Sequence, residues 1–210
     1  MIAIEYCKSV FDGTHDTPKP DVNGTHRLLT SKNIIGGKLD VSDSYTISDE
    51  DYNSINKRSK VHQWDILFSM IGTVGNVYLV TDEIIDYAIK NMGVFSCRDE
   101  YKAKWLYYFL QSPYCKKLIN VQMNGAVQKF LTLDWLRKLD IPEYTDEKKA
   151  IIDNLWNIEW KIALNNSICS DLESMAKLLY DYWFVQFDFP DENGRPYKSS
   201  GGKMVWNDEL

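Results

Sequence analysis

Histidine, paired cysteines and long apolar runs are all scarce in this chain of 210 residues. The three histidines and four cysteines are scattered, and no two have the short spacing of a zinc site or a redox pair. The cysteines are therefore expected to be reduced thiols of a cytoplasmic protein. The N-terminal residues lack the basic start and apolar stretch of a signal peptide, and no apolar run approaches the ~18 residues of a membrane span. The sequence thus predicts no metal centre, disulfide framework or membrane anchor.

Nucleotide-binding and catalytic motifs are missing as well. The loop at residues 72–75 (GTVG) is followed by Asn76 and Val77, where a Walker loop needs Lys and then Ser or Thr. No Gly-x-Gly-x-x-Gly motif and no nucleophile elbow are present. Most acidic clusters stand at turns or helix starts, where capping and solubility explain them. We therefore expect no catalytic residue, no bound cofactor and no enzymatic activity in this chain.

The net charge of −6 is unevenly distributed along the sequence. Residues 1–140 hold 17 Lys and Arg against 17 Asp and Glu, whereas residues 141–210 hold 7 against 13. An acidic balance argues against nucleic-acid binding by the whole surface. The neutral first part remains compatible with it, provided that its charges are sorted by face.

Residues 1–140 have the pattern of a mixed domain. Short β-rich runs at 65–71, 77–80 and 93–97 are separated by Gly, Pro and Asn turn signals. Two helices are expected, at about 99–111 and 133–139, the second with Thr132 as its N-cap. The predicted fold class is α+β: a globular mixed α/β domain followed by a long helix.

That long helix carries the strongest pattern in the chain. Pro142 interrupts the preceding structure, Thr145 is a candidate N-cap, and no Pro or Gly follows until after Gln186, which gives a rod of roughly 60 Å. Apolar residues recur in steps of four and three with one polar break, at Ile151, Leu155, Ile158, Ile162, Asn165, Cys169, Leu172, Ala176, Leu179 and Trp183. This seam is typical of a helix that pairs with another helix, and the alternative is a long helix buried in its own domain. The predicted divisions are 1–142 for the first domain, 143–187 for the helix and 188–210 for the tail.

Four segments together resemble one half of a type I restriction–modification specificity (S) subunit. Residues 12–20 (DGTHDTPKP) and 65–80 (DILFSMIGTVGNVYLV) resemble the opening and the central strands of a target recognition domain. Residues 125–142 (GAVQKFLTLDWLRKLDIP) resemble its junction with the conserved helix. Residues 179–206, including NGRPYKSSGGKMVW, resemble the segment that follows this helix.

The resemblance implies a non-catalytic DNA-recognition subunit that reads one half of a bipartite target and docks methyltransferase (M) and restriction (R) subunits. S-adenosylmethionine and ATP would be bound by those partners. Complete S subunits usually have two recognition domains and two helices, so this chain is either a natural half-subunit or half of a longer or split one. A half-subunit would dimerise through its helix and recognise double-stranded DNA.

Polar loops of the first domain supply the candidate DNA contacts. Mixtures of Lys with Asn, Gln, Ser and Thr suit phosphate and base-edge contacts, although each loop alone is also an ordinary solvated surface. The candidates are Thr14, His15, Thr17, Lys19, Ser31, Lys32, Asn33, Thr73, Asn76, Asn124, Gln128 and Lys129. Alternative functions are a coiled-coil adaptor that binds protein only, a small enzyme, and a regulatory half-subunit that modulates a full-length specificity subunit.

Overall fold

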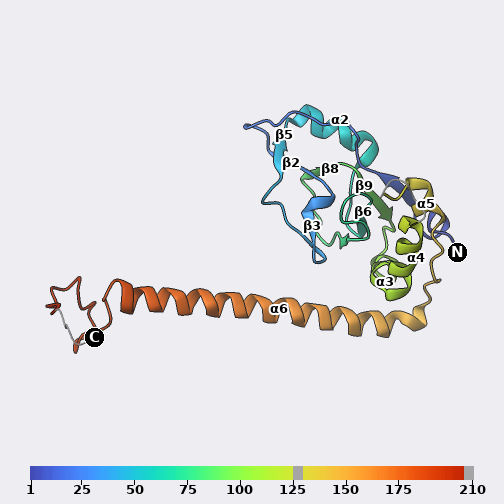
Figure 1. The fold of residues 1–210 in the computed structure, drawn as a ribbon. Helices are drawn as coiled ribbons and strands as arrows, with labels where there is room; N and C mark the ends of the chain where they lie inside the picture. Colours follow the sequence, from blue (N-terminus) through green and yellow to red (C-terminus); the bar gives the residue numbers. More distant parts are fainter. Residues whose placement is uncertain (125–129, 206–210) are drawn as a thin grey trace. The chain divides into compact units, whose positions relative to one another are not determined.

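The computed structural model describes residues 1–124 and 130–205. The chain divides into two compact units, Met1–Ile152 and Asp153–Leu210 (Figure 1). No helix in these described ranges is long and apolar enough to cross a lipid bilayer. The first unit, here the recognition unit, contains all of the strands and five complete α-helices of the described chain.

The recognition unit consists of short elements. Its helices are α1 (Ala3–Tyr6), α2 (Asp49–Ser59), α3 (Glu100–Gln111), α4 (Pro113–Asn124) and α5 (Leu133–Lys138), with 3₁₀ turns η1 (Ser31–Asn33) and η2 (Asp146–Lys148). Its strands are β1 (Ser9–Asp12), β2 (His26–Leu29), β3 (Ile34–Ile35), β4 (Lys38–Leu39), β5 (Tyr45–Ile47), β6 (Asp65–Ser69), β7 (Val77–Leu79), β8 (Tyr87–Ile89) and β9 (Met92–Ser96). The predicted mixed α/β domain followed by a long helix is confirmed.

The central sheet has four antiparallel strands in the order β1-β9-β6-β7. Every residue of β6 and β9 is buried, because both faces of these two strands are covered. Phe68 and Phe95 meet edge to face between them, with ring centroids 5.9 Å apart. Helix α3 contacts β6 and β7, and α5 packs against α1 and β1. Helices α3 and α5 therefore pack against the central sheet, and α4 packs against α3.

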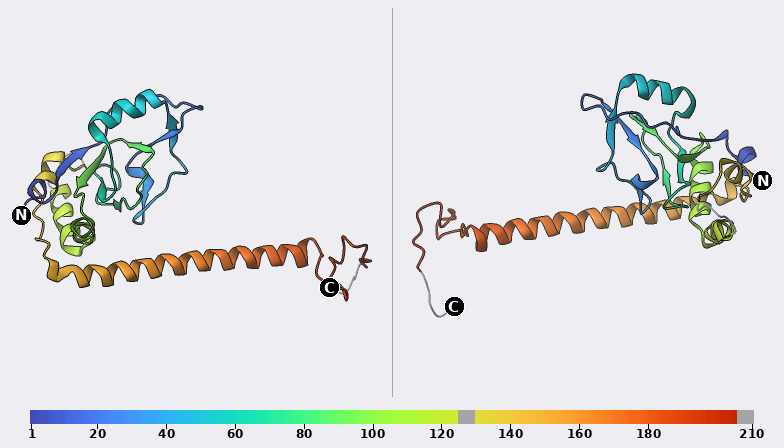
Figure 2. Two further views of the ribbon diagram at one scale, coloured as in Figure 1. Left: turned by 180° about the vertical axis from the view of Figure 1, so that it is seen from behind. Right: turned by 45° about the horizontal axis from the view of Figure 1, so that its top comes forward.

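A second sheet of three strands, ordered β5-β2-β8, lies beside the first. Strands β2 and β8 are parallel, and α2 contacts β8 from one face, as both views in Figure 2 show. Leu28, Ile47 and Ala88 are buried at this contact. The turn Lys90–Asn91 joins β8 of this sheet to β9 of the central one. This short connection fixes the two sheets next to each other.

Local capping explains where the helices begin. Thr132 accepts a hydrogen bond from the Trp135 amide at the start of α5, as predicted, and Asp99 does the same for Lys102 at α3. Three helices, α1, α2 and α4, were not predicted. The acidic run 49–51 is the first turn of α2, capped by Ser48, and α4 begins at Pro113, where proline needs no partner for an amide hydrogen.

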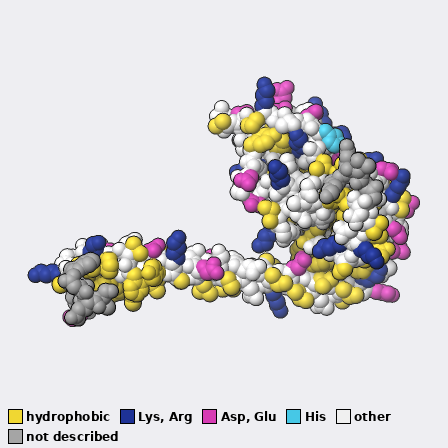
Figure 3. Space-filling view, viewed as in Figure 1, with side chains coloured by type: hydrophobic (Ala, Val, Ile, Leu, Met, Phe, Trp, Pro, Cys, Tyr) yellow, Lys and Arg dark blue, Asp and Glu magenta, His cyan; other side chains and the backbone are white. Residues whose placement is uncertain are grey.

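The long helix α6 (Lys149–Tyr180) is followed by a π-helical turn, η3 (Asp181–Val185). At its base Ile152 is fully buried, and the ammonium of Lys149 lies 4.5 Å from the ring centroid of Tyr101. From Asp153 onward its large apolar side chains are exposed, except for Trp156, which is half-buried. Leu155 is 39% exposed, Ile162 55% and Leu172 58%. Figure 3 shows hydrophobic side chains on the surface along α6, including a dense group near its C-terminal end.

A small hairpin-like tail follows the helix. The buried carboxylate of Asp188 accepts hydrogen bonds from the Ser199 amide and hydroxyl, at 2.7 and 2.6 Å. The rings of Phe189 and Tyr197 stack with centroids 4.9 Å apart. Residues 188–202 thus have their own local order.

Candidate nucleic-acid interface

The turn between β8 and β9 brings several predicted segments together. The Thr14 amide donates to the Ile89 carbonyl at 3.0 Å, and the Asn91 amide donates to the Thr14 carbonyl at 3.1 Å. The Lys90 ammonium donates to the hydroxyl of Thr17. The loop at residues 13–17, here the recognition loop, is therefore attached to this turn by both backbone and side chains.

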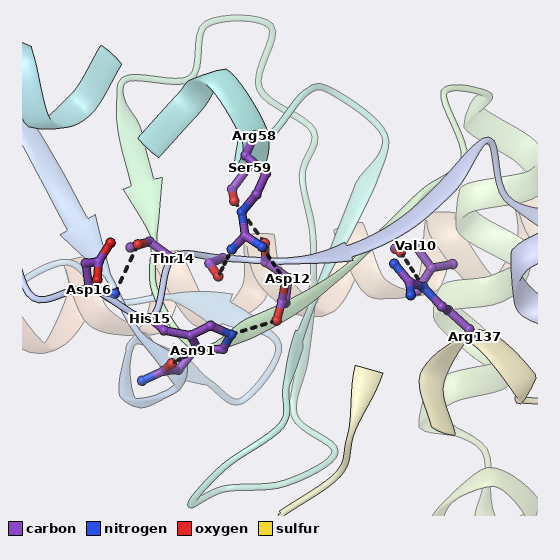
Figure 4. Close-up of polar contacts among 10 residues, drawn as sticks. Val10, Asp12, Thr14, His15, Asp16, Arg58, Ser59, Asn91 and Arg137 are labelled. Atoms are coloured by element: carbon purple, nitrogen blue, oxygen red, sulfur yellow. Dashed lines mark hydrogen bonds and ion pairs between the residues drawn. The ribbon is translucent and has the colours of Figure 1, made fainter. Parts of the chain in front are cut away.

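His15 lies at the centre of this attachment (Figure 4). Its Nδ1 is 2.8 Å from the Asn91 Oδ1 and its Nε2 is 3.0 Å from the Asp12 Oδ2. Asp12 itself is nearly buried and is held by the Arg58 guanidinium at 3.4 Å. The side chain of His15 is nonetheless 69% exposed. The ring is thus oriented by the protein while most of its surface faces solvent.

Arg58 and Ser59 at the end of α2 complete the support from behind. Arg58 donates to the Gly13 carbonyl at 3.0 Å, and the Ser59 hydroxyl donates to the Asp12 carbonyl at 2.9 Å. A Cβ at Gly13 would come within 2.5 Å of the Ile89 carbonyl oxygen. Glycine is required here because the recognition loop approaches β8 so closely.

Two further groups of candidate contact residues, at 31–33 and at 73–76, join the same region. The Ser31 hydroxyl donates to the Asn91 carbonyl at 3.3 Å, and the Thr73 hydroxyl donates to the Ser31 carbonyl, also at 3.3 Å. The Asn76 side-chain amide donates to the Ile34 carbonyl at 2.9 Å. Segments far apart in sequence therefore form one connected polar surface at the end of the central sheet where β6 ends and β9 begins.

The last group of candidates is Asn124, Gln128 and Lys129, and described residues on either side of it border this surface. Phe130 forms a β-bridge with Ile71, and the Leu131 amide donates to the Met70 carbonyl at 3.0 Å. A Cβ at Gly75 would lie 3.2 Å from Ile119 of α4, so the loop at 72–75 packs on the helix that ends at Asn124. Gln128 and Lys129 lie outside the described residues. The residues on either side of them contact the loop at residues 70–75.

The predicted contact residues fall into two groups. Thr14, Ser31 and Asn33 are buried and Asn76 is half-buried, and each makes hydrogen bonds inside the protein. The exposed group is His15, Thr17, Lys19, Lys32, Thr73 and Asn124. Whether any of them contacts DNA stays a prediction, but only the exposed group presents its side chains to solvent.

Sequence reasoning missed the residues that organise the surface. Lys90 and Asn91 connect two of the candidate segments, residues 14–17 and residues 31–33, yet neither stands in a recognisable motif. The sequence contained one local signal, the asparagine at position 91. Asn91 has φ of 52° in the structure, and asparagine is among the few side chains that adopt this conformation readily. An Asn between two apolar β-rich runs therefore marks a tight turn, but its contacts to residues 14 and 15 depend on the fold.

This arrangement presents groups that are suited to binding. The exposed lysines and hydroxyls match groups that contact phosphates and base edges. Within the described ranges, no cluster of three or more His, Cys, Asp or Glu side chains is placed to hold a metal ion.

Comparisons with known proteins agree with this reading. The sequence model of the family described as "Type I restriction modification DNA specificity domain" matches residues 17–174. None of the curated proteins matches the sequence significantly.

Three solved structures share the fold. The type I restriction-modification S subunit from M. genitalium is 14% identical with a TM-score of 0.56, covering 85% of this chain and 43% of that one. The HsdS subunit from Thermoanaerobacter tengcongensis is 15% identical with a TM-score of 0.54, covering 88% and 44%. A structure described as showing complex assembly and conformational transition of the type I R-M system is 16% identical, with a TM-score of 0.53 over 85% and 42%. The chain thus spans less than half the length of each.

The family match, residues 17–174, covers most of the recognition unit and of α6. This chain belongs to the family of type I restriction modification DNA specificity domains.

Proposed function

We propose that this chain is the DNA-reading component of a type I restriction–modification system and recognises one half of a bipartite target. The observation that carries this proposal is that three candidate segments, at residues 14–17, 31–33 and 73–76, are joined by hydrogen bonds into one polar region in a member of the specificity-domain family. Phosphate contacts would come from lysines such as Lys19 and Lys32, and base contacts from neutral polar side chains such as Thr17, Thr73 and Asn124.

The second part of the proposal is that α6 pairs with another helix of the same kind. Its seam from Ile151 to Trp183 is exposed at the large apolar positions, and exposed apolar side chains at heptad spacing favour helix association. Since the chain covers 42–44% of the related structures, a second copy would supply a second recognition unit. A two-fold pair of this kind predicts a split target with two related halves.

The chemistry of methylation and cleavage is assigned to partners. We propose that M and R subunits bind S-adenosylmethionine and ATP, that the complex assembles in the cytoplasm, and that this chain contributes recognition and docking. This division follows from family membership together with a surface built of hydroxyls, amides and lysines.

DNA binding in the presence of M subunits tests the function. The full chain, co-purified with M subunits, should bind duplex DNA with an affinity that falls steeply as salt rises, because lysine–phosphate contacts release counterions. Binding that is absent with and without M subunits would contradict the proposal. It would favour an adaptor that binds only protein.

A further inference from the structure

We infer that Asn91 is a positioning residue, which fixes the recognition loop through His15 and so sets which side chains meet the DNA. This inference rests on the proposed function, because it assigns a role within the same surface. It also changes the role expected for His15, from a direct contact with DNA to a residue that holds the recognition loop in place.

The geometry of Asn91 is specific to this role. With φ of 52°, its backbone turns from β8 into β9 and directs its amide to the Thr14 carbonyl at 3.1 Å. Its side chain reaches the next residue of the loop and contacts His15 Nδ1 at 2.8 Å. The neighbouring Lys90 contacts Thr17. Three points of the recognition loop are thereby attached to two consecutive residues.

Both nitrogens of the His15 ring face side-chain oxygens, so both contacts are hydrogen bonds when each nitrogen carries a proton. Nδ1 faces Asn91 and Nε2 faces Asp12, whose other oxygen is held by Arg58. A base could hydrogen-bond to either nitrogen only after one of these contacts broke. The ring is therefore placed to hold the loop, and the groups presented to DNA are the exposed side chains next to it, including those of Thr17 and Lys19.

A loop that is ordered before binding loses less conformational freedom on binding. The side-chain contact between Asn91 and His15 contributes this order without being needed for the turn itself. Backbone hydrogen bonds, such as that from the Lys90 amide to the Leu29 carbonyl at 2.8 Å, hold the turn whatever side chain stands at position 91. Loss of the side chain should therefore loosen the recognition loop and leave the two sheets intact.

The test uses four forms of the full chain in complex with M subunits. Asn91→Gly keeps the backbone conformation, because glycine adopts positive φ freely, and removes the contact to His15. Asn91→Asp keeps an acceptor oxygen and tolerates the same φ. His15→Ala removes the other partner. The double variant Asn91→Gly/His15→Ala completes a double-mutant cycle.

Two measurements are made on each form. Hydrogen exchange reports the order of residues 13–20 without DNA, and selection from a pool of randomised duplexes reports sequence preference. Asn91→Gly and His15→Ala should each speed exchange in this loop and reduce sequence discrimination by about 10-fold, and the double variant should be no worse than either. Asn91→Asp should keep normal exchange and discrimination, with weaker binding to all duplexes because of its added negative charge.

The outcomes separate this inference from the proposed function. Additive losses in the cycle, or unchanged exchange in Asn91→Gly, would overturn the positioning role even when the wild type selects a clear motif. If His15→Ala alone lost sequence discrimination while Asn91→Gly kept it, His15 would contact the bases directly. The positioning role of Asn91 would then be refuted. If the wild type selected no motif, the proposed function would fail, while the exchange measurement would still test the positioning role.

Discussion

The helix α6 and the recognition unit differ in where they place their apolar side chains. In α6 large apolar residues are exposed at a regular spacing, as Leu155 and Leu172 show. In the recognition unit apolar residues are buried without periodicity, and polar groups such as Ser31 and Asn33 are buried with hydrogen-bond partners. Exposed apolar side chains at heptad spacing favour association with another helix, whereas the buried polar groups find their partners within the chain. The proposed function accordingly assigns assembly to α6 and recognition to the recognition unit.

The strongest way to break this comparison is to place charges on the seam. Leu155→Asp with Leu172→Asp should dissociate the paired helices, since each buried leucine contributes about 1.5–3 kcal/mol and a buried carboxylate adds a further penalty. Sedimentation should show the mass of one chain, while the recognition unit keeps its melting transition.

The matched control adds the same charges away from the seam of α6. Asn157→Asp with Ser170→Asp places both charges at exposed positions outside the seam and should keep the paired mass. If both double variants kept the paired mass, the seam would not be the contact surface.

The pH dependence of the free energy of unfolding tests how the recognition unit holds a buried polar group, Asp65. Burial raises the pKa of Asp65 to about 6, against hydrogen bonds from Ser96 and His62 and the charge of Arg98, which lower it. The folded state then holds a proton that the unfolded chain releases near pH 4, so the free energy of unfolding should fall between pH 4 and 6, by about 3 kcal/mol.

Asp65→Asn serves as the reference, because asparagine keeps an acceptor and does not ionise. Chemical denaturation of both forms from pH 4 to 7 should give stability curves that diverge as pH rises. Parallel curves would show that the Asp65 carboxylate is not held in the buried state described here.

A single methyl group tests how tightly the recognition unit is packed. A Cβ at Gly93 would come within 2.4 Å of the Leu136 Cδ1 and 3.2 Å of the Met70 Sδ. Gly93→Ala should therefore destabilise the recognition unit by about 1–3 kcal/mol through overpacking. Adding Leu136→Ala should relieve this clash, so the double variant should lose less stability than the sum of the two single changes. Additive losses would place the two side chains out of contact.

The smallest expected effect concerns Asn165, the polar residue of the seam. Replacing it with leucine should strengthen helix pairing by about 1 kcal/mol or more, because an amide no longer has to be buried. The same change should allow other registers or larger assemblies. Equilibrium sedimentation measures both. A variant that paired more weakly and in a single state would show that Asn165 stabilises the pair instead of selecting its register.

The two parts also differed in how far sequence could predict them. The helix α6 and the N-cap Thr132 depend on residues within a few positions of one another, so their patterns were visible. The contact surface depends on contacts such as that between His15 and Asn91, 76 residues apart. The sequence suggested loops that the fold brings together but not the residues that join them. It also could not separate exposed candidates such as Lys32 from neighbours such as Asn33, which the fold buries.

Mapping of methylated sites tests the central claim most directly. The chain would be co-expressed with its M subunits in cells that lack other methyltransferases, and the modified bases would be read across the genome. A pair of identical recognition units predicts a split motif with two symmetric halves separated by a gap of fixed length. A continuous motif, an asymmetric split motif or no sequence preference would contradict a paired half-subunit that reads DNA.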